Sequence, residues 1–220
     1  MSVKETLKKW NEPRFKDSDL YVPGNFNPGL FDLNKEKLKK LCPQLFGFGA
    51  NLRLLAGSYA DRWDGIQSIL VDGNMNPAIV VSVRPLLVAH YVNLFDAVVL
   101  QCYPEELGTV NGWRNGTKLI STQFYDGPNW WKKANKDIDM GPYAGTNYKA
   151  VCPVVADLYT DNLERLERKK SEIPEGMWKR TAALAEQYMA QHPGMARNGL
   201  DVGFKDAVEI SNIEFKPIEI

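Results

Sequence analysis

Three side chains near the middle of the chain have the types that nucleophilic catalysis requires: His90, Asp96 and Cys102. A cysteine nucleophile needs an imidazole beside its thiol and a third group that orients the ring. His90 and Asp96 would not share a face of one helix. Cys102 lies in an apolar run, where burial raises the pKa of a thiol and lowers its reactivity. We therefore interpret His90 as a partly buried histidine with its hydrogen bonds satisfied and Cys102 as a core residue, and we predict no catalytic residue.

Carboxylate pairs are the other candidates for chemistry. Asp137 and Asp139 could face one side of an extended loop, as a cation site would need, and Asp61 and Asp64 form a second pair. Such pairs arise by chance among 27 acidic residues, so we interpret them as solvated. The sequence contains no phosphate-binding GxxxxGK[ST] loop, no HExxH, no EF-hand loop and no paired-cysteine zinc pattern. We predict no cofactor and no metal.

A long segment rich in aromatic residues is the feature most typical of a binding site. Residues 125–150 read as one loop, and loops of this length are usually functional or disordered. Rings beside charged and amide side chains occur where polar ligands stack and in protein interfaces. The candidate binding residues are Tyr125, Asp126, Trp130, Trp131, Tyr143 and Tyr148. The alternative is that Trp130 and Trp131 cover the core; on an extended chain they point to opposite sides, so one could be core and the other free.

The composition is that of an ordinary globular protein. The 220 residues include 27 basic and 27 acidic ones, with 44% hydrophobic and 25% charged residues. These values exclude a disordered chain and a disulfide-dense miniprotein, and they give no support to nucleic-acid binding through bulk charge. Three cysteines without a CxxC pair favour reduced thiols. The apolar stretch 85–103 is interrupted by polar residues, Asp96 among them, so we expect no membrane span and a cytoplasmic protein.

Local patterns predict the elements that must position these residues. Asp32 to Leu41 reads as a helix, and Pro85 could open another over 86–94 before a strand at 97–103; the alternative for this stretch is one long strand broken at Asp96. Asn115-Gly116 predicts a two-residue hairpin turn. The remaining expected elements are strands at 66–71 and 78–83 joined as a hairpin, a strand at 117–124, helices at 160–170 and 174–191, and a final strand within 208–218.

Together these elements predict one α+β domain over residues 1–220, in which residues 1–30 form an irregular wrapping segment. Its sheet is mixed and mostly antiparallel, with three to four helices covering it and a C-terminal helical pair before the final strand. The predicted function is a cytosolic binding module without catalytic activity that recognises a protein partner or a small polar ligand through residues 125–148. The alternative is a small hydrolase-like enzyme that uses loop carboxylates and tyrosines on a polar substrate. A third possibility is a structural subunit that self-associates through this loop and the N-terminal segment, and the oligomeric state stays open.

Overall fold

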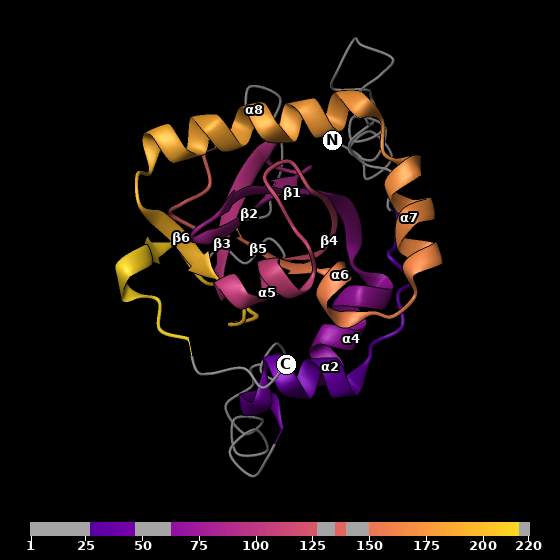
Figure 1. Ribbon diagram of the computed structural model, residues 1–220. Helices are drawn as coiled ribbons and strands as arrows, with labels where there is room; N and C mark the ends of the chain where they lie inside the picture. Colours follow the sequence, from indigo (N-terminus) through magenta and orange to yellow (C-terminus); the bar gives the residue numbers. More distant parts are fainter. Residues whose placement is uncertain (1–26, 47–62, 127–134, 140–149, 216–220) are drawn as a thin grey trace, which may run out of the picture.

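Runs of apolar residues with few polar interruptions build the strands of one curled sheet (Figure 1). The computed structural model describes residues 27–46, 63–126, 135–139 and 150–215. In this part of the chain the strand order is β5-β4-β1-β2-β3-β6-β7, and every pair is antiparallel except β3 with β6. The strands are β1 (Asn74–Val83), β2 (Leu86–Val92), β3 (Ala97–Tyr103), β4 (Lys118–Asp126), β5 (Ala150–Val155), β6 (Met195–Asn198) and β7 (Val208–Glu209).

Helices lie around the outside of this sheet (Figure 1). The longest described helix, α8, packs across β1, β2 and β3, while α4, α6 and α7 contact β4. The helices are α2 (Lys35–Leu41), α4 (Trp63–Asp72), α5 (Glu105–Val110), α6 (Ala156–Tyr159), α7 (Leu163–Glu172) and α8 (Glu175–Gln191), with the 3-10 turns η1 (Pro43–Leu45) and η4 (Ile210–Asn212).

The sheet curls until its two sides meet. Gln101 of β3 donates from Nε2 to the carbonyl of Pro153 in β5 at 3.2 Å, although three strands separate β3 from β5 in the sheet order. Arg197 of β6 donates to the carbonyl of Val151 in β5 at 2.9 Å. Side chains rather than a backbone ladder therefore close the sheet.

Curling gives the sheet an inner and an outer face. The antiparallel register, together with the alternation of side chains along a strand, puts Asn76, His90, Ser121 and Gln123 on the inner face. Helices cover the outer face, so β2 and β3 are buried along their whole length and show no alternation of apolar and polar residues.

The predicted α+β class with a mixed, mostly antiparallel sheet is confirmed. Helices predicted at 32–41, 160–170 and 174–191 correspond to α2, α7 and α8, and strands predicted at 97–103 and 117–124 correspond to β3 and β4. Asn34 and Asn162 cap α2 and α7 by accepting a backbone N–H of the first turn. The buried stripe of α8, which includes Trp178 and Ala185, packs into the core as predicted.

The strand predicted at 66–71 is wrong, because this segment lies within α4. Its buried residues Ile66, Ile69 and Leu70 have the spacing of one helix face. This spacing outweighs the strand preference of the two β-branched isoleucines. Gly73 ends the helix so tightly that an added Cβ would lie 2.1 Å from the carbonyl oxygen of Ile69. Residues 74–77, which the predicted hairpin places in its connecting loop, consequently form the start of β1.

The helix predicted at 86–94 is also wrong. Residues 86–92 form β2, which pairs with β3 in a hairpin, so the alternative of a strand broken at Asp96 lies closer to the structure. Asp96 has a φ of 46° in this turn. The hairpin predicted at Asn115-Gly116 is wrong as well, since α5 precedes the turn and β4 pairs with β1 and β5.

The C-terminal end differs from the prediction, and the predicted N-terminal segment lies mostly outside the described residues. Of the predicted final strand, β7 holds two residues and η4 follows it, because Ile210 begins a 3-10 turn that ends the pairing with β6. Of the predicted wrapping segment, residues 27–30 are described. They run beside the end of α4, where Gly29 and Leu30 donate to the carbonyls of Gly73 and Val71.

Gly199 follows β6 at a point where the chain touches a buried ring. A Cβ at Gly199 would lie 2.3 Å from the ring of Tyr103, whereas one at Gly203 would find its nearest neighbour at 3.5 Å. We expect Gly199→Ala to lower the free energy of unfolding by about 1–3 kcal/mol through overpacking. Gly203→Ala is the matched control and should change it by less than about 0.5 kcal/mol. Urea denaturation measures both, and equal stabilities of the two variants would contradict this packing.

Candidate binding site at the seam of the sheet

The free edge of β5 is where the curled sheet closes, and we call the contacts along it the seam. The Val151 N–H donates to Oδ1 of Asn135 at 3.1 Å, and the Val151 carbonyl accepts from Arg197. Pro153 has no N–H to satisfy, and its carbonyl accepts from Gln101. An open strand edge invites pairing with other chains. At the seam, side chains take up these backbone groups instead.

A buried ion pair lies at the centre of the seam. Arg197 donates from Nε and Nη2 to the two oxygens of Asp137 at 2.7 and 3.0 Å, and the Arg197 and Asp137 side chains are 2% and 6% exposed. A buried pair of this kind adds little net stability, since desolvation offsets its attraction, but removing one partner leaves an uncompensated charge. The pair therefore fixes the position of residue 137 more than it strengthens the fold.

Residues on either side of Asp137 are fastened as well. Nδ2 of Asn135 donates to Oδ1 of Asp206 at 2.9 Å, and the Lys136 N–H donates to the same oxygen at 3.1 Å. Asp139 lies 2.5 Å from Nε2 of His192, just after the end of α8. Every second residue from 135 to 139 is thus bound, each to a different part of the C-terminal third. Residues 135–139 are therefore anchored at the seam along their whole length.

Polar side chains of the inner face lead from the seam end of the sheet into its centre. The hydroxyl of Tyr125 lies 2.5 Å from Oδ1 of Asn93 and 2.9 Å from Oε1 of Gln123. Nδ2 of Asn74 donates to the same Asn93 oxygen at 3.1 Å. Phe95 meets the Tyr125 ring edge to face at 6.2 Å between centroids. Tyr125 is consequently half-buried and held by the sheet.

His90 lies deeper in this network and is fully buried. Its Nδ1 is 2.9 Å from Oγ of Ser121, a residue of β4, and the hydrogen bond crosses β1 at Ala78, whose small side chain leaves room. Burial, with the positive charge of Arg197 as a second cause, lowers the pKa of His90 to about 3. His90 is therefore a neutral core residue, buried completely rather than partly as the sequence analysis predicts, and its Nε2 has no hydrogen-bond partner among the described residues.

The cysteines also belong to the core. Cys42, Cys102 and Cys152 form no disulfide bond, and all three are buried. Burial raises the pKa of Cys102 to about 11, to which the nearby Glu105 contributes, and that of Cys152 to about 12. A thiol with so high a pKa is a poor nucleophile at neutral pH. The interpretation of Cys102 as a core residue is confirmed.

The six predicted binding residues fall into two groups. Tyr125 lies in the network described above, and Asp126 is the last residue of β4, opposite Ala150. Trp130, Trp131, Tyr143 and Tyr148 lie outside the described residues, as does Asp61. The predicted bounds of the loop agree with the end of β4 at Asp126 and the start of β5 at Ala150.

The interpretation of Asp137 and Asp139 as solvated acids holds for one of them. Asp139 is exposed, but Asp137 is buried against Arg197, so for Asp137 it is wrong. The two carboxylates bind different side chains, Arg197 and His192, rather than one ion. The sequence analysis missed Arg197, whose only local signal is a guanidinium inside the short strand MARN. Within the described residues, no cluster of three or more His, Cys, Asp and Glu side chains could hold a metal.

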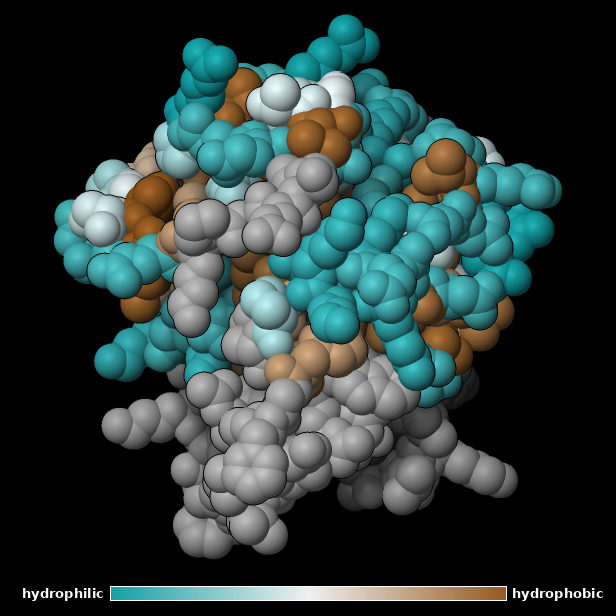
Figure 2. Space-filling view, turned by 60° about the horizontal axis from the view of Figure 1, so that its bottom comes forward, coloured by the Kyte–Doolittle hydropathy of each residue, from teal (hydrophilic) through white to brown (hydrophobic). Residues whose placement is uncertain are grey.

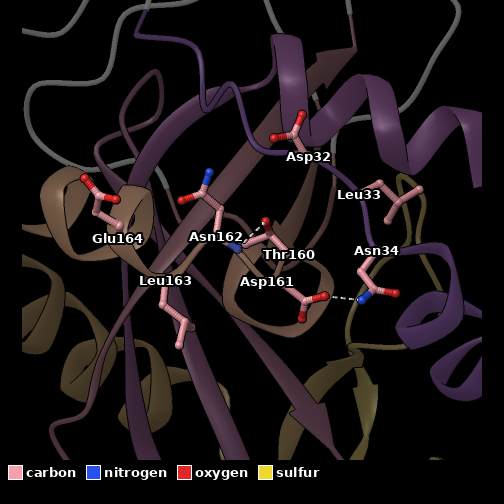
Figure 3. Close-up of a pocket in the computed structure, with 8 residues that line it drawn as sticks. All are labelled: Asp32, Leu33, Asn34, Thr160, Asp161, Asn162, Leu163 and Glu164. Carbon is pink, nitrogen blue, oxygen red and sulfur yellow. Dashed lines mark hydrogen bonds between the residues drawn. The ribbon is translucent and has the colours of Figure 1, made fainter.

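A hollow of about 610 Å³ between the starts of α2 and α7 is a second candidate (Figure 3). Most of its polar side chains already have partners. Asp161 accepts from Asn34 and pairs with Lys37 at 2.5 Å, and the Asn162 N–H donates to Thr160 Oγ1 at 3.2 Å. These contacts join α2 to the segment that precedes α7, so we interpret the hollow as a junction between helices.

The chain matches no known protein family, no curated protein and no solved structure. Among the described helices, none combines the length and the apolar character needed to cross a bilayer. The contacts at the seam are therefore the basis for a functional hypothesis.

Replacing one partner of the buried ion pair tests the seam. Asp137→Asn should lower the free energy of unfolding by about 3 kcal/mol, because Arg197 keeps its charge without a counterion. Asp201→Asn is the control, since Asp201 and Lys205 form an exposed pair 3.9 Å apart that contributes less than about 0.5 kcal/mol. Chemical denaturation at neutral pH gives both values. A seam of no importance would show itself as equal midpoints for the two variants.

The neutral His90 predicts a pH dependence of stability. In the unfolded chain the ring takes up a proton below about pH 6.5, whereas in the folded protein it stays neutral down to about pH 3. Its contribution to stability is therefore complete above pH 6.5 and is lost as the pH falls toward 3, by up to about 1.4 kcal/mol per pH unit.

His90→Gln removes this titration while an amide can still bond to Ser121. The difference in unfolding free energy between wild type and His90→Gln should then shrink steadily from pH 7 to pH 4. Carboxylates contribute equally to both proteins and cancel in the difference. Parallel pH profiles of the two proteins would show that His90 is not held neutral.

Proposed function

We propose that the protein is a cytoplasmic binding module that recognises a protein partner through residues 125–148, which comprise the end of β4 and the connection from β4 to β5; we call them the β4–β5 segment. The buried pair of Asp137 and Arg197 is the observation that carries this proposal. It fastens the middle of an aromatic-rich connection to a rigid sheet, and binding residues are typically placed on loops that a rigid scaffold positions.

The arrangement of the anchor supports recognition rather than mere closure of the chain. Two strands as close as β4 and β5 need only a short turn to join them, and the connection here is much longer. Fixing residues 135–139 divides it into two shorter segments, 127–134 and 140–149. A shorter stretch between two fixed points has less conformational entropy to lose on binding than a longer one. Trp130, Trp131, Tyr143 and Tyr148 fall on these two segments.

The cytoplasmic location rests on the thiols. Cys42, Cys102 and Cys152 form no disulfide bond in the structure, and reduced thiols persist in reducing compartments. Their burial within the fold agrees with structural rather than redox roles.

The alternative of a hydrolase-like enzyme keeps one observation in its favour. Asp139 and His192 form an exposed carboxylate–imidazole contact of 2.5 Å, a pair of types that can serve acid–base chemistry. Asp137 cannot act as a base in the same way, because both of its oxygens accept from Arg197. Three described hollows lie elsewhere and include neither Asp137 nor Asp139. The binding module is therefore the better supported function.

Removal of one indole tests the proposal. Trp131→Ala should weaken capture of the partner by the immobilised protein about tenfold or more, as for a central aromatic anchor, while the melting temperature stays close to that of wild type. The partner is first identified by mass spectrometry of what wild type retains from cells of the source organism, and its affinity is then measured by calorimetry.

The control for this experiment is Leu163→Ala, which removes an apolar side chain that is 68% exposed on α7. Its affinity for the partner should equal that of wild type. Unchanged affinity for Trp131→Ala and also for Trp130→Ala would refute recognition through this segment. A large fall in melting temperature for both variants would assign the two indoles to the core and refute it equally.

A further inference from the structure

A hollow of about 650 Å³ lies beside α5, at the end of the sheet opposite the β4–β5 segment. Its position follows from β1, a strand of ten residues that spans about 30 Å. Asn74 at one end of β1 lies beside Asn93 in the network of Tyr125, whereas Val83 at the other end lines the hollow. The lining is completed by Arg84, Glu105, Glu106, Gly108, Thr109, Val110 and Trp113.

The exposed apolar residues of the described chain are dispersed, so its hollows are the candidate recognition sites. On the face shown in Figure 2, hydrophobic side chains lie singly or in small groups among hydrophilic ones. One of the large exposed apolar residues is Val110, at the end of α5, with 60% of its surface accessible. The hollow therefore offers a concave site with the exposed Val110 in its lining at this end of the sheet.

The wall of the hollow is firm. Trp113 is half-buried and packs against the core, and its backbone N–H donates to the carbonyl of Gly108 at 2.8 Å. Gly108 itself is buried, and a Cβ there would lie 3.3 Å from the side chain of Leu86. The indole thus rests on a turn that is fixed to the sheet.

Charged groups line the hollow without neutralising one another. The Glu105 and Glu106 carboxylates and the Arg84 guanidinium are exposed, and within the described residues none of them forms an ion pair. Two carboxylates against one guanidinium leave the hollow with a net negative charge. An indole beside carboxylates is the combination that binds a cation, through the ring face and through charge-assisted hydrogen bonds.

We infer that this hollow binds the basic side chain, arginine or lysine, of a segment of a partner protein. The cation meets Trp113, Glu105 and Glu106, and an apolar residue next to it in the segment covers Val110. The volume lies in the range of ligand-binding sites. This second surface is independent of the β4–β5 segment, so either one can fail without the other.

The experiment uses the full chain and N-acetyl-arginine-methylamide as the probe. The indole N–H signal of Trp113, assigned by its loss in Trp113→Phe, is followed by nuclear magnetic resonance during the titration. We expect a saturable shift that the neutral isostere N-acetyl-citrulline-methylamide does not produce. The double variant Glu105→Gln/Glu106→Gln should bind the arginine probe about tenfold more weakly, and Glu186→Gln, an exposed acid on α8, should bind it as wild type does.

A second variant keeps the test decisive if the double variant unfolds. Arg84→Gln removes the only cation of the lining and should bind the arginine probe more tightly than wild type. The inference is overturned by a shift that stays linear to the solubility limit of the probe, or by equal binding of the citrulline analogue. It is also overturned by weaker binding to Arg84→Gln, or by saturation with N-acetyl-glutamate-methylamide in place of the arginine probe.

Discussion

One guanidinium spans the gap at which the curled sheet closes. Arg197 contacts the carbonyl of Val151 on β5 and both oxygens of Asp137, so a single side chain joins β6, β5 and the connection that precedes β5. A planar group with five donors can satisfy this many acceptors at fixed angles, which a lysine ammonium cannot do. Both the closure of the sheet and the position of residues 135–139 depend on it. Because the charge is buried, the pair tolerates only small displacements before it loses its compensation.

The inner face of the sheet makes this closure possible. Curling places polar residues of β1, β2, β3 and β4 opposite one another, where they bond in a chain from Tyr125 toward His90. In surroundings that exclude water, hydrogen-bonded polar groups permit few alternative arrangements, because a broken bond leaves an unsatisfied group. The neutral state of His90 follows from the same environment, because burial disfavours the charged ring and the positive charge of Arg197 adds to that effect. The scaffold is therefore rigid at the end that carries the proposed recognition segment.

Some of this could be predicted from the sequence, and the failures have a common cause. α7 and α8 were predictable since caps and apolar spacing act within a few turns of one helix. β3 was predictable as a short apolar run, and β4 from the alternation of its side chains after the turn at Asn115-Gly116. The segments 66–71 and 86–94 were not predicted correctly, because a short apolar run is compatible with a helix and with a strand. The neighbours decided: Ile66, Ile69 and Leu70 pack beneath the β4–β5 side as a helix face, whereas Leu86–Val92 fills the place between β1 and β3.

The sequence by itself determined the α+β class, the reduced and buried character of the cysteines, and the existence of a long aromatic connection with acidic residues at its middle. These properties follow from composition and from contacts between near neighbours. The tertiary structure alone decided that Asp137 is buried against Arg197, 60 residues away, while Asp139 stays at the surface. It also brought Trp113 beside Glu105 and Arg84 around one hollow. Such pairings depend on strand register and on the curl of the sheet, which arise from the summed packing of the whole chain and leave no mark in the spacing of the residues involved.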